Sequence, residues 1–278
     1  MNAKMNPNNI KATHVAIAAL AIAASAGVLS SCDNVNEEDR YIKIDRPTIA
    51  RKVLIQEFTG INCVNCPSGA DEVHKLQTLY PGSVIAVGMH PGGTGFSGPI
   101  GTFNLNSDLA RVYYEAYQPS GFPAAVVDGE APETNLNAWS GMVNSELSRP
   151  APADISLTPS YDEATRTVTV EYQVKINNVY SKPLNINIWL VENGIIGPQK
   201  SGAALIPNYT HNHVLRTSLT GDWGNKLADS FIPEEIYEGS VSLVLDEKWK
   251  AENCELVGFL QNNSRQVEQA AEAPVVNE

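Results

Sequence analysis

The spacing of apolar residues changes near residue 150. Between residues 51 and 149, short continuous apolar runs alternate with stretches in which apolar residues recur every three or four positions. The first pattern is typical of buried parallel strands and the second of helices with one buried face. The runs cover residues 53–58, 84–89 and 124–127, and the helical stretches cover residues 66–79, 108–116 and 135–147. This order predicts an α/β domain with a partly parallel sheet.

After residue 150 the period becomes two. Apolar and polar residues alternate in residues 167–176 and 184–190, and further apolar runs follow at 241–245 and 256–260. One-sided alternation with turn-like breaks predicts an antiparallel, Ig-like β-sandwich. The proline-rich segment at the change of period is expected to be a semi-rigid linker. We therefore predict domains at residues 51–149 and 150–266 and a polar tail at 267–278.

The first 31 residues have the pattern of a secretory signal. Lys4 and Lys11 precede an apolar stretch at residues 15–24, which ends in small residues before Cys32. Leu29-Ser30-Ser31-Cys32 resembles a bacterial lipobox. That resemblance implies cleavage before Cys32 and acylation of this residue, giving a stable membrane anchor. The alternative is an ordinary signal with a chance cysteine. Residues 32–50 would then be the lipidated cysteine and an acidic tether.

The net charge and the number of cysteines exclude some classes of function and of fold. The chain has 19 basic and 31 acidic residues, a net charge of −12. Such a charge argues against nucleic acid as a partner and against an electrostatic hold on anionic lipid. Four cysteines are too few for a disulfide-stapled scaffold, so the fold must be held by apolar cores.

Cys63-Val64-Asn65-Cys66 is the strongest chemical motif. It lies between a predicted strand and a predicted helix, where helix-terminal N–H groups stabilise a thiolate. A dithiol centre needs one thiolate that attacks and a second thiol that resolves the mixed disulfide. We predict Cys63 as the nucleophile and Cys66 as the resolving thiol. Pro67 is compatible with the first turn of the helix.

Two other interpretations of the motif stay open. Structural zinc needs four ligands, and the remaining candidates are dispersed along the sequence. They are His74, His90, His211, His213 and Cys254. A purely structural disulfide is the more serious alternative in an oxidising compartment. We expect no metal and no cofactor, and we expect Cys254 to be a buried inert thiol. The sequence at residues 93–98 has the spacing of a dinucleotide-binding motif, but Pro99 and Gly101 would break the required helix, so a loop beside the redox site is expected.

The residues around the motif resemble the thioredoxins. Glu57-Phe58 resembles the acidic-aromatic pair on their central strand, and Gly121-Phe122-Pro123 resembles their cis-proline loop. The resemblance implies a thioredoxin-like α/β domain. It also implies proton transfer by Glu57 and substrate binding by Phe122 and Pro123. The chain departs from the family at Asn62, where tryptophan is usual, and at Val64-Asn65, so the direction of redox chemistry is not set.

The whole plan resembles a narrower family. A lipobox, a C-x-x-C-P motif and a β-rich second half containing residues 209–216 are similar to the Omp-type outer-membrane lipoproteins of Bacteroidetes. The resemblance implies a lipid-anchored location in the outer membrane. The leading hypothesis is thiol–disulfide exchange on protein thiols or disulfides. The rival is a surface binding protein or adhesin with a structural disulfide, and in either case the sandwich would present a surface for a ligand.

Overall fold

The structure is a computed structural model that describes residues 50–276. The predicted signal, Cys32 and all but the last residue of the tether lie outside the described residues. The described residues belong to one compact unit. Within residues 50–276, no helix is both long enough and apolar enough to cross a membrane.

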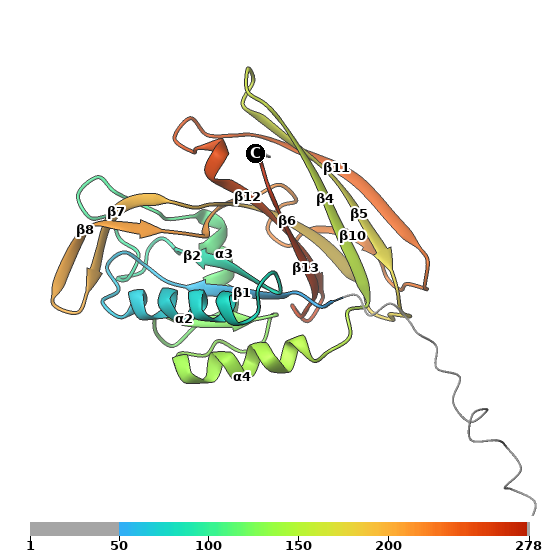
Figure 1. The fold of residues 1–278 in the computed structure, drawn as a ribbon, viewed down its shortest axis with the longest axis horizontal. Helices are drawn as coiled ribbons and strands as arrows, with labels where there is room; N and C mark the ends of the chain where they lie inside the picture. The colour runs from blue at the N-terminus through green and yellow to red at the C-terminus, as the bar shows by residue number, and fades with distance from the viewer. Residues whose placement is uncertain (1–49, 277–278) are drawn as a thin grey trace, which may run out of the picture. The chain divides into compact units, whose positions relative to one another are not determined.

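A mixed sheet runs through this unit and contains strands from both halves of the chain (Figure 1). Its order is β13-β12-β6-β9-β2-β1-β3, with β10 added beside β6. β1 pairs in parallel with β2 and antiparallel with β3. The two halves meet where Gly88 of β2 pairs with Val214 of β9. The strands are β1 Val53–Phe58, β2 Val84–Met89, β3 Ala124–Val127, β6 Leu184–Glu192, β9 Val214–Ser218, β10 Asn225–Ala228, β12 Cys254–Asn262 and β13 Val267–Pro274.

Three α-helices in the described part of the chain cover the two faces of this sheet near β1, β2 and β3. They are α2 Cys66–Leu79, α3 Asp108–Tyr117 and α4 Leu136–Leu147, which confirms the three predicted helices. α2 and α4 share a core with one face of the sheet, and α3 packs on the other. Ser107 caps α3, because its side chain accepts a hydrogen bond from the backbone of Ala110, and Asp108 is the first helical residue.

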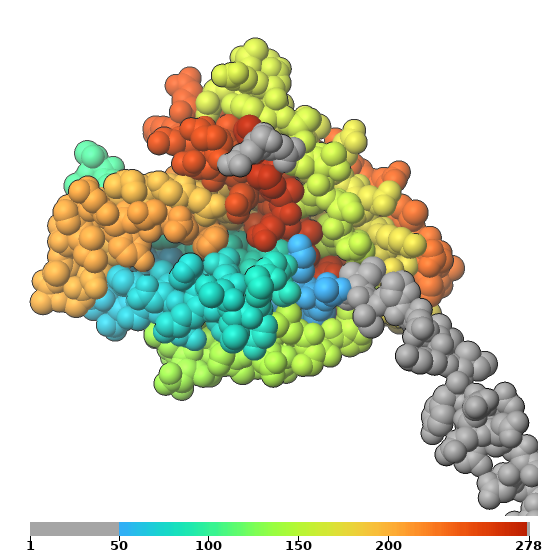
Figure 2. All heavy atoms as spheres, viewed as in Figure 1, coloured from blue at the N-terminus to red at the C-terminus, as the bar shows by residue number. Residues whose placement is uncertain are grey.

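Two smaller sheets complete the fold. The strands β4 Ala153–Asp162, β5 Thr167–Ile176 and β11 Ile236–Val244 form an antiparallel sheet in the order β11-β5-β4. Its apolar face packs on β6, β12 and β13 in a second core. The strands β7 Ile195–Ser201 and β8 Ala204–His211 form a hairpin that lies beside α2 (Figure 2).

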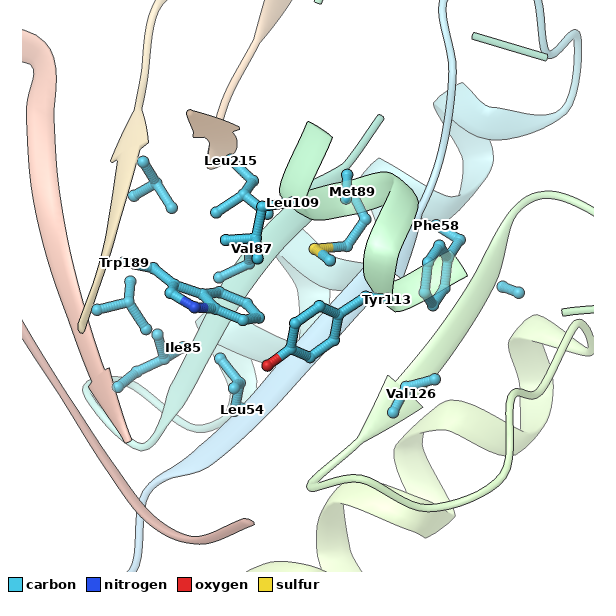
Figure 3. Close-up of a cluster of buried hydrophobic side chains, with 14 of the residues drawn as sticks. Leu54, Phe58, Ile85, Val87, Met89, Leu109, Tyr113, Val126, Trp189 and Leu215 are labelled. Atoms are coloured by element: carbon cyan, nitrogen blue, oxygen red, sulfur yellow. The ribbon is translucent and has the colours of Figure 1, made fainter. Parts of the chain in front are cut away.

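The core beneath α3 shows how closely the halves are joined (Figure 3). Trp189 of β6 packs edge-on against Tyr113 of α3, with ring centroids 4.9 Å apart. Leu54 of β1 and Leu215 of β9 belong to the same cluster, and both are fully or almost fully buried. Removing these side chains from water stabilises the halves together.

The predicted fold class is wrong. The described chain is mostly β, and it is not an α/β thioredoxin-like domain followed by an all-β sandwich. The strands and helices follow the predicted spacing of apolar residues, but β6, β9, β12 and β13 extend the sheet that begins with β1 and β2. Strand pairing is not local, so the sequence period cannot reveal it. The division at residue 150 stays a prediction, and the sheet crosses that point.

The predicted polar tail is also wrong. Residues 267–274 form β13, which pairs antiparallel with β12 along its length. The guanidinium of Arg51 donates hydrogen bonds to the carbonyl oxygens of Val267 and Glu268, at 2.8 and 2.7 Å. Glu268 and Gln269 of β13 are buried, close to the start of β1.

Candidate functional site

Cys63 and Cys66 form a disulfide, and their Cα atoms are 5.4 Å apart. Cys66 is the first residue of α2, and Asn65 is its N-cap. Cys63 lies two residues before the cap, in a turn where the amide of Cys66 donates to the carbonyl oxygen of Cys63 at 3.4 Å. Each cysteine is only 2% exposed. The predicted pair is therefore joined at the helix start, and both sulfurs are used in a bond that leaves no free thiolate for zinc.

The β7–β8 hairpin holds the backbone of the disulfide loop. The amide of Lys200 donates to the carbonyl oxygen of Ile61 at 2.9 Å, and the amide of Gly202 donates to that of Val64 at 3.0 Å. The buried side chain of Gln199 adds hydrogen bonds from Nε2 to the carbonyl oxygens of Cys63 and Gly60, at 3.0 and 3.2 Å. A segment far along the chain thus fixes the loop that carries the disulfide.

Gly69 of α2 brings two predicted site residues together. A Cβ atom at this position would lie 2.5 Å from Oε1 of Glu57 and 2.7 Å from Cβ of Pro123. No real side chain tolerates such contacts, so glycine is what lets both residues approach the helix one turn after Cys66. The structure therefore places Glu57, Pro123 and the disulfide around the first turns of α2.

Glu57 is buried, and its Oε1 has no hydrogen-bond partner among the described residues. Burial raises the pKa of Glu57 to about 8 because the charged carboxylate loses its hydration. The carboxyl group therefore keeps its proton at neutral pH and can exchange it close to neutrality.

Phe122 and Pro123, the predicted binding residues, lie near Asn65 of the disulfide loop. The peptide bond between Phe122 and Pro123 is cis, as the sequence indicated. The ring of Phe122 stacks on that of Phe96, with centroids 4.8 Å apart. A shallow groove runs from here along Asn65 and Ser68 at the start of α2. Phe96 itself is 41% exposed, although its ring contacts Phe122.

The loop at residues 91–103 has no helix, in agreement with the prediction, and it borders the disulfide loop. The amide of Asn62 donates to the carbonyl oxygen of Phe96 at 2.8 Å, and its side-chain amide donates to Gly98 at 2.6 Å. Asn62 therefore fixes this loop where the thioredoxins usually have tryptophan.

A cavity of about 220 Å³ lies behind Cys66 and Glu57, between α2 and the end of β8. Its lining includes four histidines: His74, His90, His211 and His213. Nδ1 of His90 and Nε2 of His211 are buried without a partner among the described residues. Burial lowers the pKa of His90 to about 3 and that of His211 to about 4, so both are neutral at physiological pH. A polar cavity of this size is suited to ordered water.

The structure also places His211, His213 and Cys254, three of the candidate zinc ligands. His211 ends β8, and His213 follows in a left-handed backbone conformation with φ of 56°. No group of three or more His, Cys, Asp or Glu residues in the described part is arranged to hold a metal ion. Cys254 is free and buried, as expected, and burial raises the pKa of its thiol to about 12.

The sequence did not indicate Gln199 or Gly69 as parts of the site, and it indicated Phe96 only as a member of the loop expected beside the site. Gln199 lies in a strand of the second half, and its distance along the chain hid it. A glycine in the first turns of a helix was a usable signal for Gly69, because glycine in a helix interior is unfavourable without a packing reason.

Comparison with known proteins identifies the family. Residues 110–278 match the outer membrane protein Omp28 family. The chain belongs to this family, and membership indicates an outer-membrane protein. A search of curated proteins finds no significant match.

Two solved structures are similar in fold. HBP35 of Porphyromonas gingivalis has a TM-score of 0.65 at 16% identity, covering 82% of this chain and 76% of that protein. A structural-genomics target from Agrobacterium tumefaciens has a TM-score of 0.50 at 13% identity, covering 83% of this chain and 97% of that one. At these identities the likeness concerns the fold alone.

Proposed function

We propose that this outer-membrane protein exchanges disulfides with protein thiols through Cys63 and Cys66. One observation carries the proposal: a disulfide at a helix start packs beside a buried, protonated carboxyl and a cis-proline loop. A structural disulfide requires neither Glu57 nor Pro123 to approach α2. Leaving Glu57 buried without a hydrogen bond costs roughly 1–3 kcal/mol, and a role in proton transfer explains that cost.

The oxidised form reacts by accepting electrons from a substrate dithiol. A substrate thiolate attacks Sγ of Cys63, the Cys63–Cys66 bond breaks, and its electron pair leaves on Cys66. Glu57 then protonates the Cys66 thiolate. The second substrate thiolate attacks the substrate sulfur of the mixed disulfide and displaces Cys63, so that the substrate leaves oxidised and the site is left as a dithiol.

The reverse direction uses the same groups. The Cys63 thiolate attacks a substrate disulfide and one substrate sulfur leaves as a thiolate. Glu57, now ionised, takes the proton of Cys66, which attacks Cys63 and releases the reduced substrate. The cavity behind Cys66 supplies a route for water to exchange the proton of Glu57 with solvent, since exposed residues such as His74 form its rim.

The rival function is surface binding with a structural disulfide, and one observation favours it. The hairpin hydrogen bonds and the low exposure of both cysteines restrict access to the sulfur atoms. Exchange therefore requires that a substrate reach Cys63 from the Phe96–Phe122 side, or that the β7–β8 hairpin move.

Selective alkylation of the reduced protein distinguishes the two functions. Exchange requires Cys63 to react with iodoacetamide much faster than Cys66 at pH 7, with a thiolate pKa clearly below that of an ordinary cysteine. Glu57→Gln should leave the rate at Cys63 unchanged and should slow closure of a mixed disulfide by Cys66. Equal, slow alkylation of both cysteines would support the structural role.

We also propose that Cys32 carries a lipid that attaches the protein to the outer membrane. The proposal rests on the lipobox-like sequence, since Cys32 lies outside the described residues. Incorporation of a labelled fatty acid into the wild type, and its loss in Cys32→Ala, would support it. Protein dithiols or disulfides are the proposed partners of the redox site.

A further inference from the structure

The three-stranded sheet has an open edge at β11. Among the described strands, β11 pairs only with β5, on its other side. Its nine residues contain no proline and no lysine, and Glu238 is its single charge. Natural sheets protect long edges with such residues because an open edge pairs readily with another strand. An unprotected edge of this length indicates a pairing partner.

The hydrogen bonds at both ends of β11 show which backbone groups face the open edge. The amide of Leu245 donates to the carbonyl oxygen of Arg166 at 2.8 Å, and the amide of Ile176 donates to that of Glu235 at 2.9 Å. In an antiparallel pair, alternate residues bond to the same neighbour. Odd-numbered residues of β11 therefore bond to β5, and the even-numbered residues direct their N–H and C=O groups to the free edge.

The exposed apolar side chains on the outer face of β11 lie symmetrically about Ser240. Ile236 and Val244 are 53% and 65% exposed, and each lies four residues from Ser240. Between them lie Glu238 and Ser242, each two residues from it. A copy of β11 turned by 180° about Ser240 would place Ile236 opposite Val244 and Glu238 opposite Ser242. We propose that two copies of this chain pair antiparallel through β11, with the two-fold axis at Ser240.

Neighbouring registers are less favourable. With the axis at Glu238, two glutamates would oppose each other, and with the axis at Ser242, Glu238 would oppose Asp246. With the axis at Gly239, Glu234 would oppose Val244. With the axis at Val241, Asp246 would oppose Ile236. Like charges opposite one another destabilise a sheet, and matched apolar pairs stabilise it. The register centred on Ser240 is the one that separates the acids and pairs the apolar residues.

This pairing has a chemical consequence that can be measured. Directly opposite residues in a hydrogen-bonded antiparallel pair have Cα atoms about 5.5 Å apart, within the range of a disulfide. The Ser240→Cys variant should therefore form a disulfide between two copies. Ser242→Cys is a matched control on the same face, because its counterpart would lie four residues along the partner strand, roughly 13 Å away.

The experiment uses the full chain in its own membranes, treated with a mild oxidant and analysed without reductant. We expect a species of twice the chain mass for Ser240→Cys, with at least tenfold less for Ser242→Cys. Equal cross-linking of the two variants, or none in either, would overturn the proposal. A cross-linked species of another mass would also overturn it, because a different protein would then occupy the edge.

A proline substitution tests the backbone pairing without cysteine chemistry. Ser240→Pro removes an N–H that faces the open edge and keeps the bonds to β5, a position at which edge strands tolerate proline. We expect the detergent-extracted full chain to sediment as a dimer and Ser240→Pro to sediment as a monomer with unchanged circular dichroism. A wild-type monomer, or a dimer that survives Ser240→Pro, would contradict the two-fold strand pair.

Discussion

Nε2 of Gln199 donates a hydrogen bond to the carbonyl oxygen of Cys63 at 3.0 Å, although the two residues are 136 positions apart. The same nitrogen bonds to Gly60. Both acceptors belong to the loop that carries the disulfide, so the conformation of this loop depends on the β7–β8 hairpin. We therefore expect the hairpin to restrict access to Cys63.

Replacing Gln199 with alanine should loosen that loop. The change removes the side-chain donor from the carbonyl oxygens of Cys63 and Gly60, which keep only a backbone donor each. Losing these two hydrogen bonds should lower the free energy of unfolding by roughly 1–3 kcal/mol. Reduction of the Cys63–Cys66 disulfide by dithiothreitol should become several-fold faster. Gln173→Ala is the control, because its amide bonds to Glu238 on an exposed surface. An unchanged reduction rate in Gln199→Ala would show that the hairpin does not restrict access.

Gly69→Ala should disturb the site from within α2. The added methyl group would collide with Glu57 and Pro123, and such overpacking costs roughly 1–3 kcal/mol. Thermal unfolding should detect the loss. In Gly141→Ala of α4 the new Cβ meets no atom within 4 Å, so this control should gain roughly 0.5–1 kcal/mol from helix propensity. A Gly69→Ala protein as stable as Gly141→Ala would contradict the close approach at α2.

The titration of Glu57 should appear in the stability of the fold. Burial raises the folded-state pKa from 4.5 to about 8, so the folded state binds more protons than the unfolded state between these values. The contribution of Glu57 to stability is present below pH 4.5 and is lost as the pH rises to about 8. Urea unfolding should show that Glu57→Gln removes a slope of at most about 1.4 kcal/mol per pH unit. Parallel pH profiles for the two proteins would show that Glu57 titrates normally.

The start of β1 depends on a buried cluster of charges. Arg51 contacts Asp128 at 2.7 Å and Glu146 at 3.1 Å. Arg51→Met leaves the buried Asp128 carboxylate without its cation, while Glu146 keeps its ion pair with Arg149, and should cost about 3–5 kcal/mol. Arg111→Met removes a mostly exposed pair with Glu115 and should stay within about 1 kcal/mol of the wild type. Denaturant titrations of the two variants should therefore differ widely, and similar midpoints would contradict a structural role for the buried cluster.

Local features of the fold could be predicted from the sequence, and their assembly could not. The runs at β1, β2 and β3 and the three helices follow from periodicity. Asp128 and Gly129 form a turn after β3, as an Asp-Gly pair favours, with φ of 45° and 83°. The periodicity did not reveal that Asp128 is fully buried against Arg51, because an ion pair between distant residues leaves no local pattern. Residues 267–274 looked like a tail because the partners of the buried side chains of Glu268 and Gln269 lie far away along the chain, at Lys52, Arg149 and Tyr180.

The candidate site also combines residues that the sequence indicates with neighbours that only the fold brings together. Cys63 and Cys66 were predicted from their local motif, and Glu57 and Pro123 from the resemblance to the thioredoxins. All four lie around the start of α2. The cover of that site by β7 and β8, and the histidine-lined cavity behind it, depend on β9 joining β2. That pairing brings residues from the second half of the chain to the disulfide, which periodicity cannot indicate.

The most direct test of the proposed exchange is a trap with Cys66→Ser in whole cells. Without the resolving thiol, a mixed disulfide between Cys63 and a substrate should persist, and mass spectrometry should identify the captured protein. Cys63→Ser is the matched control and should capture far less. If the site exchanges disulfides, capture of covalent partners should require Cys63, and the partners should dissociate on reduction. The absence of such partners, or equal capture by the two variants, would contradict it.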